Sequence, residues 1–348
     1  MRRFCLVLVG VVLGLAGALV GAVSDGASAA AARARCRATA FVANEGSGTV
    51  STIDVKTRTK NPADIGVGTN PFAVAVTPDG KTALVTNQVN GTVSTIDVKT
   101  RAKDPVDIDV GSVAFWVAVA PNGKSAFVTN NDSGTVSTVD VKTRTKDPTD
   151  IAVGGNPKGV AVTPDGKTAF VTQANLGLGL VPGPSGNSVS TIDAKTRTKN
   201  RSEIPVGSSP LDVAVTPDGK TAFVTNSASD TVSMIDVKTK TKDPNDIEVG
   251  AFPVGVAVTP NGKTAFVVNR DSGTVSTIDV KTRTRDPDDI VVGALPAEVA
   301  ITPDGKTAFV TNQGGTVSTI DVKTRTKNPT DVPVGSLPIG VAVTPCRR

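Results

Sequence analysis

The chain has 348 residues and a formal net charge of +5, with no histidine, no tyrosine and three cysteines. The missing histidine removes the commonest general base and metal ligand. Haem ligation by histidine and histidine-dependent lyase chemistry are therefore excluded. The mildly basic balance is weak evidence for any particular partner.

Residues 1–29 have the pattern of a secretory signal peptide. Arg2 and Arg3 precede an apolar run over 4–23, and Ala27 and Ala29 form an A-x-A cleavage site. An uncleaved anchor is the alternative, because the run is nearly long enough to span a bilayer. We expect a secreted or cell-wall-associated protein with a short linker at 30–35 and one domain at 36–348.

The rest of the chain consists of repeats of one sequence unit. The motif V-S-T-I-D and its near copies end on Asp54, Asp97, Asp140, Asp193, Asp236, Asp279 and Asp321. The spacing is 43 residues except for one of 53 and one of 42, and a P-D/N-G-K turn recurs in step. A period of this size indicates a repeat architecture, which decides the fold.

Each repeat predicts four strands, exemplified by 74–77, 168–172, 274–280 and 150–153. The first has the smallest side chains, which suits a crowded axis, and the fourth follows a Lys-rich turn and Pro148, which suits an edge. Seven such units predict an all-β, seven-bladed β-propeller. An open β-solenoid is the alternative, but the two ends of the chain carry complementary half-repeats.

Those half-repeats predict how the ring closes. The segment 340–345 supplies the first strand of a blade, and 37–44 supplies its second. Cys346 and Cys36 both fall where the P-D-G-K turn of that blade would be, so we expect a disulfide between them. The chain-entropy estimate for such a bond is roughly 5 kcal/mol. Two unpaired cysteines at frayed ends are the alternative.

Three tetrads, at 127–130, 223–226 and 309–312, read F-V-T-N and resemble the YVTN tetrad of YVTN-type β-propeller repeats. The V-S-T-I-D and P-D-G-K motifs follow in the same order as in that family, over residues 36–346. Departures are Phe for Tyr throughout, Leu84, Ala43, Gln173 and Val268. The resemblance implies a fold shared with surface-layer proteins, lactonase-like enzymes and quinoprotein subunits, so the fold does not fix the function.

Candidate site residues are those that break the repeat. Loops between blades and between second and third strands share one face, which we call the first face. The residue before V-A-V, at the channel mouth on this face, is Ala73, Trp116, Gly159, Asp212, Gly255, Glu298 or Gly340. With the preceding residues, we predict a pocket made by Phe115, Trp116, Lys158, Asp212 and Glu298, partly covered by an insertion near 176–187. The alternative is a plug of irregular side chains that fills the mouth.

We expect a binding or protein-interaction scaffold with an unknown protein or cell-envelope ligand, acting as a monomer without metal or cofactor. The opposite, second face carries Lys56, Arg58, Lys60, Lys81 and their copies, so binding of a polyanion such as DNA or an acidic cell-wall polymer is an alternative. A lactonase-like hydrolase that uses Asp212 and Glu298 as an acid/base pair is another. No catalytic constellation is evident, which favours a protein that is not an enzyme.

Overall fold

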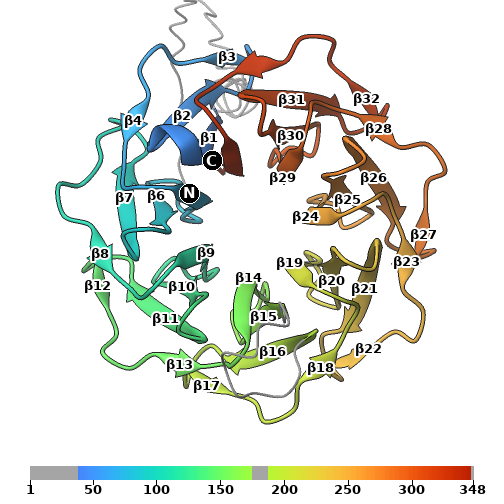
Figure 1. The fold of residues 1–348 in the computed structure, drawn as a ribbon, viewed down its shortest axis with the longest axis horizontal. Coiled ribbons are helices and arrows are strands. Elements are labelled where there is room, and N and C mark those ends of the chain that lie inside the picture. The colour runs from blue at the N-terminus through green and yellow to red at the C-terminus, as the bar shows by residue number, and fades with distance from the viewer. Residues whose placement is uncertain (1–37, 175–186, 346–348) are drawn as a thin grey trace, which may run out of the picture. The chain divides into compact units, whose positions relative to one another are not determined.

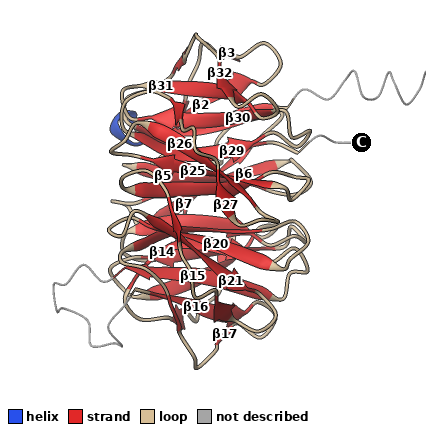
Figure 2. Cartoon of the chain, turned by 90° about the vertical axis from the view of Figure 1, so that its right-hand side faces the viewer, coloured by secondary structure: helices blue, strands red, loops and turns tan. Residues whose placement is uncertain are grey.

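The computed structural model describes residues 38–174 and 187–345. They form a closed ring of seven β-sheets around a central axis, and the side view shows the ring as one disc-shaped layer (Figures 1 and 2). The first strands touch in the cycle β5, β9, β14, β19, β24, β29, β34 and back to β5. The predicted seven-bladed propeller is therefore confirmed, and the open solenoid is wrong.

Each blade is named here by its first, innermost strand. The first strands are β5 (Pro71–Val76), β9 (Ala114–Val119), β14 (Asn156–Val162), β19 (Pro210–Val215), β24 (Pro253–Val258), β29 (Pro296–Ile301) and β34 (Pro338–Val343). The second strands are β6 (Thr82–Asn87), β10 (Ser125–Asn130), β15 (Thr168–Ala174), β20 (Thr221–Asn226), β25 (Thr264–Asn269), β30 (Thr307–Asn312) and β1 (Thr39–Asn44). The third strands are β7 (Thr92–Asp97), β11 (Thr135–Asp140), β16 (Ser188–Asp193), β21 (Thr231–Asp236), β26 (Thr274–Asp279), β31 (Thr316–Asp321) and β2 (Thr49–Asp54).

The outermost strand differs in detail from the prediction. In six blades it consists of two short pieces that both pair with the third strand. The first pieces are β12 (Thr145–Lys146), β17 (Thr198–Lys199), β22 (Thr241–Lys242), β27 (Thr284–Arg285), β32 (Thr326–Lys327) and β3 (Thr59–Lys60), and the second pieces are β13 (Ile151–Ala152), β18 (Ile204–Pro205), β23 (Ile247–Glu248), β28 (Ile290–Val291), β33 (Val332–Pro333) and β4 (Ile65–Gly66). In the β5 blade only β8 (Ile108–Asp109) forms, together with a single bridge between Ile96 and Lys103. The sequence assigned the first piece to a turn. A proline such as Pro148, which cannot donate to the ladder, follows it and interrupts the strand.

The ring closes as predicted. Strand β34 from the C-terminal end pairs with β1 from the N-terminal end. Thr39 and Thr344 exchange two hydrogen bonds, each 2.9 Å long, beside this pairing. Cys36, Cys346, the leader 1–29, the linker 30–35 and the insertion up to residue 186 lie outside the described residues, so the disulfide and the signal peptide stay predictions.

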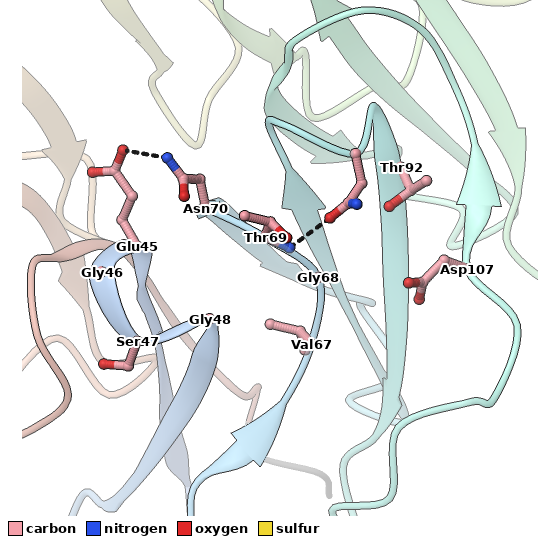
Figure 3. A pocket seen from close by; sticks show the side chains of 11 residues that line it. Glu45, Gly46, Ser47, Gly48, Val67, Gly68, Thr69, Asn70, Thr92 and Asp107 are labelled. Carbon is pink, nitrogen blue, oxygen red and sulfur yellow. Dashed lines mark hydrogen bonds between the residues drawn. The ribbon is translucent and has the colours of Figure 1, made fainter.

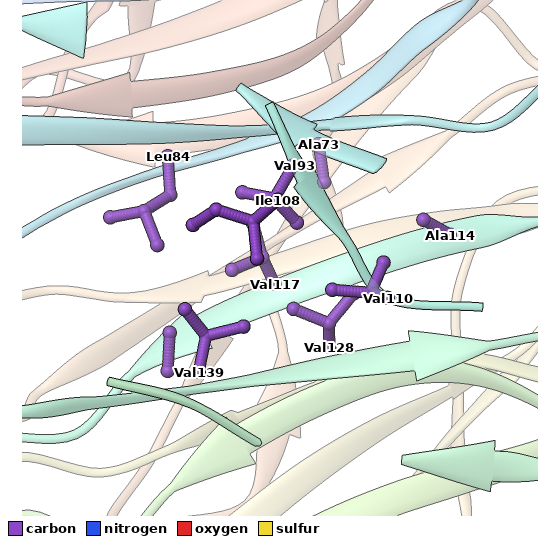
Figure 4. Packing of buried hydrophobic residues seen from close by; sticks show 10 residues of the cluster. Ala73, Leu84, Val93, Ile108, Val110, Ala114, Val117, Val128 and Val139 are labelled. Atoms are coloured by element: carbon purple, nitrogen blue, oxygen red, sulfur yellow. The ribbon is translucent and has the colours of Figure 1, made fainter. Parts of the chain in front are cut away.

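Hydrophobic clusters lie between neighbouring blades rather than within one. Leu84, on the second strand of the β5 blade, packs against Val117 and Val128 of the β9 blade (Figure 4). The other blades place a fully buried phenylalanine at this position: Phe41, Phe127, Phe170, Phe223, Phe266 and Phe309. The third residue of the F-V-T-N tetrad, Thr86 in the β5 blade, accepts from the amide of Ala73 and donates to the carbonyl of Phe115 in the next blade. Within the described residues, no helix is long and apolar enough to cross a membrane.

Candidate functional site

Five repeats use the tetrad position of Thr86 to join their first strand to that of the next blade. The threonines are Thr86, Thr129, Thr172, Thr225 and Thr311, and they donate to the carbonyls of Phe115, Lys158, Leu211, Val254 and Ile339. Val268 and Ala43 stand at this position in the other two repeats and carry no hydroxyl. The carbonyls of Ala297 and Phe72 therefore receive no such bond. Both residues line the pocket described next.

A pocket of about 170 Å³ opens at the channel mouth on the first face. We call it the mouth pocket; it is lined by Phe72, Phe115, Trp116, Leu211, Phe252, Val254, Arg270, Ala297, Gln313 and Ile339. Phe72 and Phe115 approach to 4.1 Å between ring centroids, and Trp116 lies 6.0 Å from Phe72 with its ring edge-on. Six of the seven blades contribute, so the pocket sits on the ring axis.

Two of the five predicted residues, Phe115 and Trp116, line this pocket directly. Lys158 does not line it, but its Nζ lies 4.3 Å from the centroid of the Phe115 ring, a cation–π arrangement. Burial lowers the pKa of Lys158, and the charge of Asp132 partly opposes that shift. Aromatic contact and a nearby carboxylate thus offset the desolvation of this ammonium group.

The other two predicted residues, Asp212 and Glu298, lie one position along the strand from the lining residues Leu211 and Ala297. Asp212 is 4% exposed, and its two carboxylate oxygens accept from the amides of Val213, at 2.7 Å, and Val256, at 2.9 Å. Because Val256 belongs to the next blade, the Asp212 carboxylate reaches across the blade boundary. Burial raises the pKa of Asp212 to about 7.

Glu298, on β29, reaches toward the β24 blade from the side opposite Asp212. It is 6% exposed, and its Oε1 accepts from the amide of Val299 at 3.0 Å. Its Oε2 has no hydrogen-bond partner among the described residues and lies 3.0 Å from the point where a Cβ on Gly255 would stand. Burial and the neighbouring Asp212 charge raise the pKa of Glu298 well above its usual value. The two buried carboxylates therefore reach the β24 blade from its two sides, Asp212 at the Val256 amide and Glu298 at Gly255.

Sequence reasoning missed Phe252, Arg270 and Gln313. Arg270 follows β25 directly and lies 5.8 Å from the Phe252 ring, and its guanidinium donates to Gln313 at 3.4 Å. The residue at this position in the other repeats is Glu45, Gln88, Asn131, Ala174, Ser227 or Gln313, so Arg270 is the one cation in the set. Comparing this position across repeats would have found it.

The residue before the first strand has a positive φ in all seven repeats, at Asn70 (53°), Val113 (54°), Gly155 (56°), Ser209 (55°), Phe252 (53°), Leu295 (49°) and Leu337 (49°). This left-handed conformation, which bulky residues seldom adopt, is therefore a feature of the repeat. Of these residues, Phe252 lines the mouth pocket. Leu295 and Leu337 remain 45% and 46% exposed. The first face therefore presents apolar surface beside the mouth pocket.

A second hollow on the first face, of about 610 Å³, lies between the short 3-10 helix η1 (Glu45–Ser47) and the loops at Thr69 and Asn90 (Figure 3). Its polar groups already bond to one another: Asn90 accepts from the amide of Thr69 at 2.5 Å, and Asn70 donates to Glu45 at 3.5 Å. These hydrogen bonds are typical of turns and fix the loops that surround the hollow.

The cations of the blade edges are largely paired. Lys and Arg side chains of the outer strand bond the carboxylate four residues on, as in Lys60–Asp64 and Lys242–Asp246, both at 2.7 Å. Arg144 also pairs with Asp104 of the neighbouring blade. Local pairing reduces the electrostatic field that would attract a polyanion, whose binding stays a prediction.

Within the described residues no group of three or more Asp, Glu, Cys or His side chains could hold a metal ion.

Comparison with known proteins supports the fold. A family model described as lactonase, 7-bladed beta-propeller, matches residues 185–294, less than half of the chain. Kuenenia stuttgartiensis hydrazine synthase shares 23% identity over 81% of this chain and 91% of its own, with a TM-score of 0.71. A protein of Bacteroides uniformis ATCC 8492, provisionally described as a 6-phosphogluconolactonase, shares 16% identity over 89% of this chain and 100% of its own, with a TM-score of 0.75. A functionally unknown protein of Desulfotomaculum acetoxidans DSM 771 shares 14% identity over 89% and 99%, with a TM-score of 0.76. Comparison with curated protein sequences finds no significant match.

Proposed function

We propose that the protein is a secreted or cell-envelope β-propeller of the YVTN-repeat type that binds a small ligand with an apolar body in the mouth pocket. The observation that carries this proposal is the aromatic wall of Phe72, Phe115 and Trp116 on the ring axis. Aromatic and aliphatic walls with a few polar groups are typical of ligand pockets.

The test uses Trp116, which is the only tryptophan of the chain. Titration with the neutral probe 2-phenylethanol should change the Trp116 emission in a saturable way. Phe115→Ala should weaken that binding, whereas Val291→Ala, an exposed position on the outer strand β28, should not. An emission that does not respond to the probe, confirmed by calorimetry, would refute ligand binding at this pocket.

A lactonase-like hydrolase is a second candidate with comparable support. It rests on the family model matched over 185–294 and on the buried pair Asp212 and Glu298. One ionised carboxylate would take a proton from the water that attacks the lactone carbonyl. The neutral partner would protonate the departing ring oxygen, so that one water is added and the ring opens.

The hydrolase is tested by titrating the acid released from 6-phosphogluconolactone and from an unphosphorylated δ-lactone. Asp212→Asn and Glu298→Gln should each abolish turnover if the pair performs acid/base catalysis. Turnover that persists in both variants, or no turnover above the uncatalysed rate in the unmodified protein, would dismiss this candidate and leave the binding proposal in place.

A further inference from the structure

The break in the repeat at Val268 leaves a cluster of oxygen acceptors at Gly255. Two oxygens lie close to the point where a Cβ on Gly255 would stand. Glu298 Oε2 is 3.0 Å and the Ala297 carbonyl oxygen is 3.1 Å from that point. We call this space the Gly255 cradle. Any larger residue at 255 would meet both oxygens.

The Gly255 cradle contains hydrogen-bond acceptors, and one of them, a carboxylate oxygen, has no donor in the part of the chain that the structure describes. Glu298 Oε2 is buried and unpartnered among the described residues. The Ala297 carbonyl occupies the position that a threonine hydroxyl serves in five other repeats, and Val268 cannot donate to it. An unpaired buried acceptor is unfavourable, so a donor that enters the cradle would be stabilised.

The charged side chain that raises the pKa of Glu298 is Asp212, another carboxylate. Asp212 approaches from the other side of Gly255 through its bond to the Val256 amide. A cation placed here would face the Glu298 carboxylate and the Ala297 carbonyl, both acceptors, which suits the several donors of a primary ammonium group.

The apolar mouth pocket adjoins the cradle, because Val254 and Ala297, the chain neighbours of Gly255 and Glu298, line it. A metal ion would need further oxygen ligands that these walls do not offer. We propose that the Gly255 cradle binds the ammonium group of a primary amine whose apolar body lies in the mouth pocket. This inference rests on the proposed binding function and names the ligand class.

The experiment compares 2-phenylethylamine with its neutral isostere 2-phenylethanol on the full chain, by calorimetry and Trp116 emission. The amine should bind at least about tenfold more tightly, the effect of one charge-assisted hydrogen bond. Gly255→Ala should remove this preference, since its methyl group would fill the cradle. Gly66→Ala, where a Cβ meets nothing within 4 Å, is the matched control and should retain it.

A second variant avoids any dependence on correct folding of Gly255→Ala. Val268→Thr supplies the hydroxyl that other repeats carry, so it should not weaken the fold and should reduce the amine preference. Ala43→Thr makes the same change beside Gly340, where the next blade has Ala73 instead of a glutamate, and should leave the preference unchanged.

The outcomes separate the two proposals. Equal affinity for amine and alcohol would overturn the ammonium site and leave the pocket in place. No binding of either probe would refute both. Saturable binding of Ca²⁺ that is lost in Glu298→Gln and competes with the amine would make this a metal site and overturn the inference.

Discussion

The blade body and the channel mouth of this propeller use different kinds of buried polar group. In the blade body, Asn226 donates to Thr231 at 3.1 Å and to Ser233 at 2.9 Å, and Ser233 donates to Asp246 at 2.8 Å. The same chain of bonds recurs in most blades. At the mouth, Asp212 and Glu298 occur once each, and one oxygen of Glu298 is unpaired among the described residues. Both regions hold buried oxygens without a partner among the described residues, such as Asn226 Oδ1 in the blade body, but at the mouth that oxygen belongs to a carboxylate that occurs once.

The largest expected difference between the two regions is in how much their aromatic residues contribute to the free energy of unfolding. Phe223 is fully buried between blades, so Phe223→Ala should lower the free energy of unfolding by about 3–5 kcal/mol. Phe115 is only half-buried at the mouth, and Phe115→Ala should cost about 1 kcal/mol. Chemical denaturation measures both. Equal losses would mean that the mouth aromatics are structural and form a plug.

The next effect concerns the repeated asparagine. Asn226→Ala removes one buried and one partly buried hydrogen bond and leaves the Ser233 and Thr231 hydroxyls without this donor, so it should cost about 2 kcal/mol. Asn245→Ala, in an exposed turn of the same blade, is the control and should change stability by less than about 0.5 kcal/mol. If both variants unfold at the same denaturant concentration as the parent, the polar chain does not stabilise the blade.

The central carboxylates should respond to pH with the opposite sign from the peripheral ones. Hydrogen bonds from the amide and hydroxyl of Thr100 lower the pKa of Asp97, so its contribution to stability is present at neutral pH and is lost as the pH falls. Burial raises the pKa of Asp212 to about 7 from a usual value of 3.8. The folded state then holds that proton more tightly, and stability is lost as the pH rises from about 4 to about 7.

Glu298→Gln tests this assignment. It removes the second buried charge while its amide oxygen can still accept from Val299, so at pH 8 it should raise the free energy of unfolding by about 1 kcal/mol. The gain should shrink as the pH falls, because the parent carboxyls then become neutral. A variant that is destabilised equally at pH 5 and pH 8 would show that Glu298 stabilises the channel as an ion.

The repeat allowed the fold to be predicted almost completely, including the blade shared by both ends of the chain. Each strand and turn pattern occurs in several copies, so no single departure hides it. Asp54, which ends the first V-S-T-I-D copy, fixes the following turn as its counterparts do in the other repeats, because its Oδ1 accepts from the Thr57 amide at 2.9 Å. The outer strand was less well predicted, since two-residue pieces such as β12 and β13 carry too few residues for a pattern. For the site, the breaks at Trp116, Asp212 and Glu298 were found. Arg270 was missed because the position after the tetrad has no fixed residue to break, and only its positive charge distinguishes it from the other six residues there.

The smallest predicted effect concerns the ion pairs that join blade edges. Arg144 pairs with Asp104 of the neighbouring blade, so Arg144→Ala should cost about 0.5 kcal/mol at low ionic strength and less at high salt. Arg101 occupies the same turn position one repeat earlier, where the residue that corresponds to Asp104 is Asn61. Arg101→Ala should therefore change stability less, and its effect should not depend on salt. A salt-dependent loss of equal size in both variants would mean that these arginines act through the overall charge of the second face, which would favour the polyanion-binding alternative.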